Sequence, residues 1–247
     1  MGEVGPGAGP RTVDFQTSLG TIPVTGVFGD RFKVLAITGA WAPPSEMSRL
    51  AVAVAPDFDG VVATLPGNRS PALAQTSIPA WATAFDEVVD QLGPTLVLGM
   101  SIGALVALGM RSPVAIMAIE PPLSTRKLWP MLSVLRDMFS AEPAFVETVF
   151  GYSDRGWEDR DYRFLLDGLA VPTDVLVGDS PLFPERPTQR FPSVVDEPER
   201  VFLAAHPRVT LHTIPNTGHN VPSYAGLQML EILMRALRAC SPDGSKG

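Results

Sequence analysis

Cysteine and histidine are scarce in this sequence. Cys240 is the single cysteine, which excludes a disulfide within the chain and fits a reducing compartment. The three histidines form no cluster with cysteine or carboxylate residues at the spacing of a metal site. We therefore expect a cytoplasmic protein that needs no metal and no other cofactor.

Basic charge and long apolar runs are also lacking. The formal net charge of −7 gives no reason to expect nucleic acid or an anionic membrane as a partner. The first ten residues are rich in glycine and proline and have neither the basic nor the apolar region of a signal peptide. The longest apolar stretch, residues 94–110, is too short for a membrane span and is interrupted by Gly99 and Ser101. The expected partner is a small molecule, and the oligomeric state stays open.

The sequence does contain enough apolar residues for one sizeable domain. It has 247 residues, of which 45% are hydrophobic, and no internal repeat, so the chain can bury a substantial core. We expect a disordered tail over residues 1–11, a core made of residues 12–120 and 173–240, a helical cap inserted at residues 121–172, and a tail over residues 241–247.

Short apolar strands alternate with helical segments along the expected core. This order predicts an α/β fold with a mostly parallel central sheet and helices on both faces. A hairpin around Gly20 precedes the alternation. The expected strands are residues 12–19, 21–27, 33–38, 58–65, 95–98, 114–119, 173–178 and 208–214, and the expected helices include residues 45–54, 78–92, 197–205 and 224–239.

The alternation breaks over residues 121–172, which contain no convincing strand. Apolar side chains recur there at helical spacing, in stripes within residues 128–139, 145–150 and 162–169. A helical insertion between two strands of an α/β domain indicates a small cap. The alternative is that these segments are ordinary crossover helices packed on the sheet.

The motif Gly99-Met100-Ser101-Ile102-Gly103 joins an apolar strand to a helical run. So sharp a turn forces Ser101 into a strained backbone conformation, and side chains two positions away on either side would collide with the turn. The turn raises the serine hydroxyl above the sheet, and the helix directs its free N–H groups at an anion formed there. Ser101 is therefore the candidate nucleophile; the alternative is an ordinary serine in a glycine-rich turn.

A serine nucleophile needs a base within hydrogen-bond reach. His206 ends an expected helix, and His212 lies inside an expected strand. His219 alone lies in a loop after a strand, at the carboxyl edge where open α/β sheets bind ligands. We therefore expect His219 to be the base, with a helix-capping histidine as the alternative.

The base in turn needs a carboxylate to hold its tautomer. Asp179 follows the strand at residues 173–178 and lies between serine and histidine in chain order. Glu120 ends the preceding strand and could reach the same imidazole from the neighbouring position. Asp179 is the favoured acid, and Glu120 stays open.

Together these features resemble the α/β-hydrolase fold family over about residues 12–237. The resemblance rests on the Gly-x-Ser-x-Gly elbow, the order serine, acid, histidine, the Gly218-His219 loop and the Leu65-Pro66-Gly67 turn. It implies an oxyanion hole made of the backbone N–H groups of Ala40 and Ile102.

The sequence departs from the family pattern at two places. Thr38 stands where a histidine is common, although the oxyanion needs only a backbone donor from this loop. Asp179 follows Gly178 at once, whereas the family often has two residues between them, so Pro181 stands at the usual acid position. Because some relatives place the acid after the preceding strand, this departure keeps Glu120 in play.

The function expected from these residues is a serine hydrolase that cleaves a carboxylic ester or related acyl bond through an acyl-enzyme. Trp41, Trp129 and Leu135 are expected to line an apolar acyl pocket, or else to pack between cap and core. The alternative functions are a thioesterase or acyltransferase, and a non-catalytic receptor for a small molecule on the same scaffold.

Overall fold

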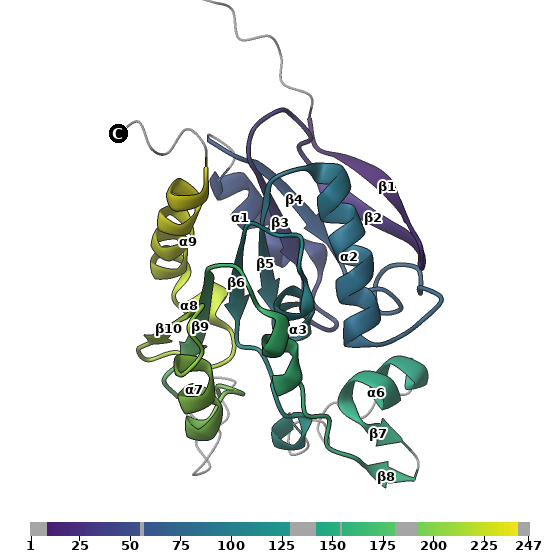
Figure 1. The fold of residues 1–247 in the computed structure, drawn as a ribbon, viewed down its shortest axis with the longest axis vertical. Coiled ribbons are helices and arrows are strands. Elements are labelled where there is room, and N and C mark those ends of the chain that lie inside the picture. Colours follow the sequence, from purple (N-terminus) through teal and green to yellow (C-terminus); the bar gives the residue numbers. More distant parts are fainter. Residues whose placement is uncertain (1–8, 55–56, 129–141, 154, 181–191, 242–247) are drawn as a thin grey trace, which may run out of the picture.

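The computed structural model describes residues 9–54, 57–128, 142–153, 155–180 and 192–241, and an eight-stranded sheet forms its centre (Figure 1). β2 pairs antiparallel with both β1 and β4, and the remaining neighbours are parallel. In spatial order the strands are β1 (Arg11–Thr17), β2 (Gly20–Gly26), β4 (Asp59–Ala63), β3 (Lys33–Ile37), β5 (Thr95–Met100), β6 (Ala115–Ile119), β9 (Thr173–Gly178) and β10 (Val209–Ile214).

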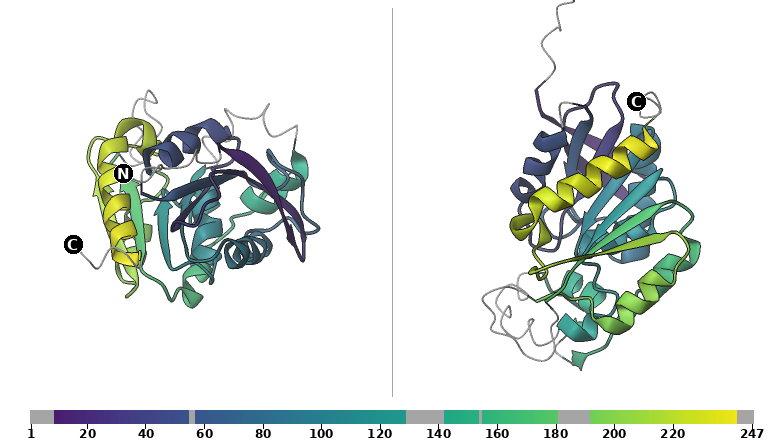
Figure 2. Two further views of the ribbon diagram at one scale, coloured as in Figure 1. Left: turned by 90° about the horizontal axis from the view of Figure 1, so that it is seen from above. Right: turned by 90° about the vertical axis from the view of Figure 1, so that its left-hand side faces the viewer.

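Helices cover both faces of this sheet (Figure 2). α2 (Ile78–Leu92) and α3 (Ile102–Gly109) pack on one face, and α1 (Pro44–Val54) and α9 (Gly226–Cys240) pack on the other. The central strands are buried on both faces and are therefore continuously apolar rather than alternating. The expected fold class, a mostly parallel sheet between helices, is confirmed.

The expected elements of the core are found within a few residues of their predicted ends. α2 begins where Ser77 Oγ accepts the N–H of Ala80 at 3.2 Å, and it ends at Gly93, whose φ of 83° suits glycine. α7 (Glu197–Ala204) also matches its prediction. The last expected helix, residues 224–239, differs from the structure at its start. A short helix, α8 (Val221–Tyr224), comes first, and α9 begins at Gly226 after the capping residue Ala225.

The described part of residues 121–172 combines helical turns with one very short hairpin. It consists of η1 (Thr125–Leu128), α6 (Pro143–Phe150), β7 (Tyr152–Ser153), β8 (Gly156–Trp157) and η2 (Arg163–Gly168). In Figure 1, α6 and the β7–β8 hairpin lie at the lower end of the molecule, toward which the arrowheads of the parallel strands point. η2 instead packs against α3, as a crossover segment would. The hairpin was not expected, since strands of two residues leave no periodicity to detect.

Some predictions fall on residues that the structure does not describe. The stripe within residues 128–139 lies almost wholly outside the described residues, and so do most of the two expected tails. The cap boundaries therefore stay a prediction. No helix in the described part of the chain is both long enough and apolar enough to cross a membrane.

The close contact between α3 and the loop after β3 makes a prediction about stability. A Cβ atom on Gly103 would lie 2.4 Å from the carbonyl oxygen of Ile37, whereas one on Gly226 would meet nothing within 4 Å. We expect Gly103→Ala to lower the free energy of unfolding by about 3 kcal/mol and the Tm by about 6–12 °C, because backbone must move. Thermal unfolding measures this, with Gly226→Ala as the control. Equal Tm values for the two variants would contradict the close packing.

Candidate active site

Ser101 occupies the sharp turn between β5 and α3. Its φ of 53° and ψ of −117° are unfavourable for any residue with a side chain. Its N–H donates to Ile119 O at 2.8 Å and its carbonyl accepts the N–H of Ala104 at 2.9 Å. The sheet and the helix thus each hold one side of Ser101, which keeps the strained conformation in place.

The loop after β3 lies directly against Ser101. A Cβ atom on Gly39 would lie 3.3 Å from Ser101 Cβ, so the backbone of this loop reaches the candidate nucleophile. Within the described residues, the N–H groups of Ala40 and Ile102 donate no hydrogen bond. Ile102 is also the first residue of α3, where the helix dipole favours negative charge. Ile102 thus follows Ser101 directly, and Ala40 follows the glycine that lies against it.

His219 lies at the same edge, in the loop after β10, and faces Glu120. Its Nδ1 is 3.3 Å from Glu120 Oε2, and its side chain is 15% exposed. An ionised carboxylate only accepts hydrogen bonds, so Nδ1 carries the proton in this contact. The contact therefore assigns the tautomer and orients the ring.

Glu120 is wholly buried and is held by further donors. Its Oε1 accepts the N–H of Gly178 at 2.6 Å and the hydroxyl of Ser193 at 2.8 Å, while Oε2 accepts the N–H of Val194 at 2.8 Å. Its own φ is 52°, an unusual value for glutamate directly after a strand. A buried carboxylate this well supplied with donors is held in one orientation at the site.

Arg200, on α7, supports the residues that hold Glu120. Its Nε donates to Val195 O at 2.9 Å, and its Nη2 donates to Ser193 Oγ at 3.3 Å and to the carbonyl of Gly178. The guanidinium is thus linked to the buried carboxylate of Glu120 through the hydroxyl of Ser193. Ser193 and Arg200 were not expected from the sequence, because only tertiary packing brings them to Glu120.

Asp179, the acid that the sequence favours, is turned elsewhere. It is exposed, and its Oδ1 accepts the N–H of Thr217 at 3.2 Å and the hydroxyl of Ser180 at 3.4 Å. Its side chain starts immediately after Gly178, which leaves no loop to carry it toward the histidine. Of the two carboxylates left open, the structure pairs Glu120 with His219, so the geometry favours the alternative over Asp179.

The other two histidines lie away from Ser101, in keeping with the choice of His219. His206 Nδ1 accepts the N–H of Arg208 at 3.2 Å. His212 Nε2 lies 2.6 Å from Asp174 Oδ1, across β10 and β9. In the described residues, no three histidine, cysteine or carboxylate side chains are grouped so that they could hold a metal ion.

The expected pocket residues are only partly described. The ring of Trp41 stacks on Phe150 at 5.4 Å between centroids and meets Phe145 edge-on at 5.6 Å. This packing against α6 is the alternative that the sequence left open for Trp41. Trp129 and Leu135 lie outside the described residues, so their place in an acyl pocket stays a prediction.

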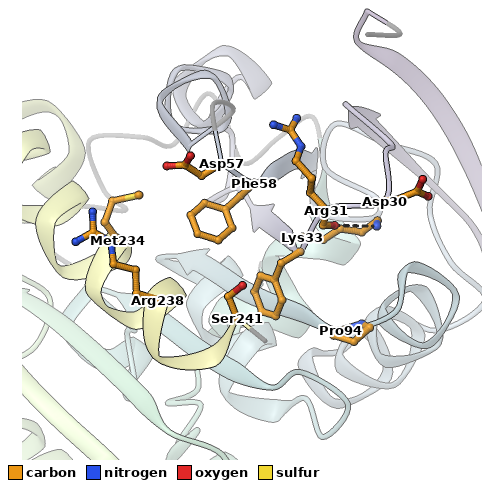
Figure 3. A pocket seen from close by; sticks show the side chains of 10 residues that line it. Asp30, Arg31, Lys33, Asp57, Phe58, Pro94, Met234, Arg238 and Ser241 are labelled. Atoms are coloured by element: carbon orange, nitrogen blue, oxygen red, sulfur yellow. Dashed lines mark hydrogen bonds between the residues drawn. The ribbon is translucent and has the colours of Figure 1, made fainter. Parts of the chain in front are cut away.

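A hollow of about 660 Å³ lies at the opposite end of the sheet (Figure 3). Lys33, Phe58 and Pro94 place it at the amino ends of β3, β4 and β5, and Met234 and Arg238 face it from α9. The length of β5 separates Pro94 from Ser101 by roughly 20 Å. This hollow is therefore not the cavity of the candidate active site.

The comparisons with known proteins agree with this fold. The chain matches the model of the alpha/beta hydrolase family over residues 34–229. A thermophilic esterase from Thermogutta terrifontis is 18% identical, with a TM-score of 0.65 over 94% of this chain and 99% of that chain. The N-acyl homoserine lactonase AidH is 18% identical, with a TM-score of 0.68 over 94% and 98%. A thioesterase domain from the curacin biosynthetic pathway is 17% identical, with a TM-score of 0.63 over 92% and 100%. A search of curated proteins finds no match.

The fold and the strained serine between β5 and α3 place the chain in the α/β-hydrolase class of structures. With the matched model covering most of the sequence, the chain belongs to the alpha/beta hydrolase family.

The enclosure of Glu120 makes a prediction about stability that does not depend on catalysis. Glu120→Gln should lower the free energy of unfolding by about 2–4 kcal/mol, because the amide N–H₂ must face a donor that the carboxylate accepted. Asp179→Asn is the matched control and should change it by less than about 0.5 kcal/mol, since Asp179 is exposed. Urea unfolding of both variants measures the difference. Equal losses would show that Glu120 is not held as described.

Proposed function

We propose that this protein is a serine hydrolase that cleaves carboxylic esters or related acyl bonds through an acyl-enzyme. The observation that carries the proposal is the contact between His219 Nδ1 and the buried Glu120, at the edge where Ser101 is held in its strained turn. Nucleophile, base and orienting carboxylate come from three separate loops of one sheet edge. Packing alone does not explain why polar groups should converge there.

The mechanism follows from the roles of these groups. Ser101 Oγ attacks the acyl carbonyl carbon while His219 Nε2 takes its proton, and Glu120 stabilises the imidazolium through Nδ1–H. The N–H groups of Ala40 and Ile102 stabilise the oxyanion of the tetrahedral intermediate. When the intermediate collapses, the imidazolium protonates the leaving alcohol and the acyl group stays on Ser101. Water, deprotonated by His219, then attacks the acyl carbon and releases the acid and free Ser101.

A thioesterase or acyltransferase is the second candidate. The similar folds include an esterase, a lactonase and a thioesterase domain, which differ in the group that leaves the acyl carbon. The chemistry at Ser101 is the same for an alcohol and a thiol leaving group. Because both leaving groups require the same residues of the site, the two candidates are separated by the substrates compared in the experiment below.

Removal of the nucleophile tests this proposal. A serine-directed phosphonate should add one adduct to the wild-type chain and none to Ser101→Ala, as measured by intact mass. The variant should hydrolyse p-nitrophenyl esters of graded chain length at least about 10³-fold more slowly than wild type, because the acyl-enzyme cannot form. Acyl-CoA substrates run beside the esters separate the two candidates. Labelling that persists in Ser101→Ala would overturn the assignment.

The two carboxylates give a matched test of the orienting acid. Glu120→Gln should lower kcat by about 10³–10⁴-fold, because the imidazole loses control of its tautomer and the imidazolium loses its counter-charge. Asp179→Asn should stay within about threefold of wild type, since the carboxylate contacts Thr217 and not His219. Both kcat values are measured at a temperature where circular dichroism shows folded protein. The reverse ranking would assign the role to Asp179.

A further inference from the structure

Asn68 connects the loop after β3 with the helix α6. Its side chain is largely buried, with 9% of the residue exposed. Oδ1 accepts the backbone N–H of Trp41 at 2.6 Å, and Nδ2 donates to Glu142 Oε2 at 2.5 Å. One amide therefore bridges a residue next to Ala40 and the residue that precedes α6.

The position of Trp41 makes this bridge relevant to the oxyanion hole. The N–H of Trp41 belongs to the same peptide group as the carbonyl of Ala40, so its hydrogen bond fixes the plane of the peptide that follows Ala40. The N–H of Ala40 belongs to the preceding peptide, and its direction depends on this plane through the φ and ψ angles of Ala40. Arg69 Nε also donates to Trp41 O at 3.0 Å, so both the N–H and the carbonyl of Trp41 are hydrogen-bonded. Its φ of 57° is a strained value that needs such support.

Glu142 determines which way the amide of Asn68 points. An ionised carboxylate only accepts hydrogen bonds, so it requires Nδ2 on its own side and leaves Oδ1 for the N–H of Trp41. The same helix also contacts the side chain of Trp41, through the rings of Phe145 and Phe150. α6 thus holds the ring of Trp41 directly, and Glu142, the residue before α6, holds the backbone of Trp41 through Asn68.

We propose that Asn68 is a positioning residue that, oriented by Glu142, aims the N–H of Ala40 at the developing oxyanion. This inference rests on the proposed function, since it assigns Ala40 a part in the reaction. It makes the oxyanion hole depend on α6, which lies outside the central sheet. A misplaced donor stabilises the transition state less, while binding of the ground state changes little. We therefore expect the substitution to lower kcat rather than to raise KM.

The first experiment replaces Asn68 and measures ester hydrolysis. Asn68→Ala should lower kcat by about 10–100-fold with KM within about threefold, less than the loss from deleting an oxyanion donor outright. An ester and its thionoester are compared, because a thiocarbonyl sulfur accepts hydrogen bonds poorly. The ratio of kcat/KM for the ester to that for the thionoester should fall by about 10–100-fold in the variant, since only the oxygen ester depends on the donor.

The second experiment reverses the polarity of the bridge. Asn68→Asp should lower kcat by about tenfold or more, because its carboxylate opposes Glu142. Adding Glu142→Gln supplies a donor in place of the lost Nδ2 while the new carboxylate still accepts the N–H of Trp41. This double variant should recover kcat and the ester-to-thionoester ratio to within about threefold of wild type. Glu147→Gln, on the exposed side of the same helix, is the control and should change neither quantity.

The outcomes distinguish this inference from the proposed function. If wild type hydrolyses no ester and Ser101 takes no phosphonate, the proposed function itself fails. If wild type is active and Asn68→Ala keeps its kcat, or loses ester and thionoester activity in equal proportion, the positioning role is overturned. Should Asn68→Ala not fold, the double variant decides: recovery supports the role, and failure to recover in a folded double variant refutes it.

Discussion

A carboxylate that is fully enclosed by protein must be matched by donors, and Glu120 is the carboxylate on which this active-site edge depends. Its donors come from the end of β9, from residues 193–194 and from the loop after β10. Each of these segments is therefore tied to β6 by a charge-assisted hydrogen bond, which is stronger than a neutral one. His219 is one donor among several, so the contact that orients its imidazole also holds the edge together.

Backbone strain gathers at the same edge. In the described part of the chain, four residues other than glycine have positive φ, namely Trp41, Ser101, Glu120 and Asn216. They follow β3, β5, β6 and β10, so all four lie in loops at the carboxyl ends of parallel strands. Strained residues persist only where the surrounding structure over-determines them, and they concentrate at functional sites. The dihedral angles thus indicate this edge without reference to any motif.

The strands and the strained turn at Ser101 could be predicted from the sequence because their signals are local. Apolar runs mark the buried strands, and the glycines around Ser101 are required by contacts as close as 2.2 Å between backbone and a Cβ at Gly99. For the carboxylate that orients His219, the sequence left two candidates, Asp179 and Glu120. Strand ends and chain order do not show how far a side chain reaches. Glu120 has one methylene more than Asp179 and starts from a different strand, and the structure pairs it with His219.

The supporting residues could not be predicted at all. Ser193, Arg200, Asn68 and Glu142 each have at least one partner more than 20 positions away in sequence, and nothing in their own neighbourhood distinguishes them from surface residues. The β7–β8 hairpin was missed for another reason, because two-residue strands have no pattern. Local sequence patterns thus indicate candidate residues, while the orientation of their side chains depends on contacts between distant segments.

The most direct test of the account is a crystal structure of the protein after reaction with a phosphonate ester. We expect phosphorus bonded to Ser101 Oγ, and the phosphoryl oxygen within hydrogen-bond distance of the N–H groups of Ala40 and Ile102. We also expect His219 Nδ1 on Glu120, with Asp179 directed at Thr217. Phosphorus on another residue, or His219 paired with Asp179, would contradict this account.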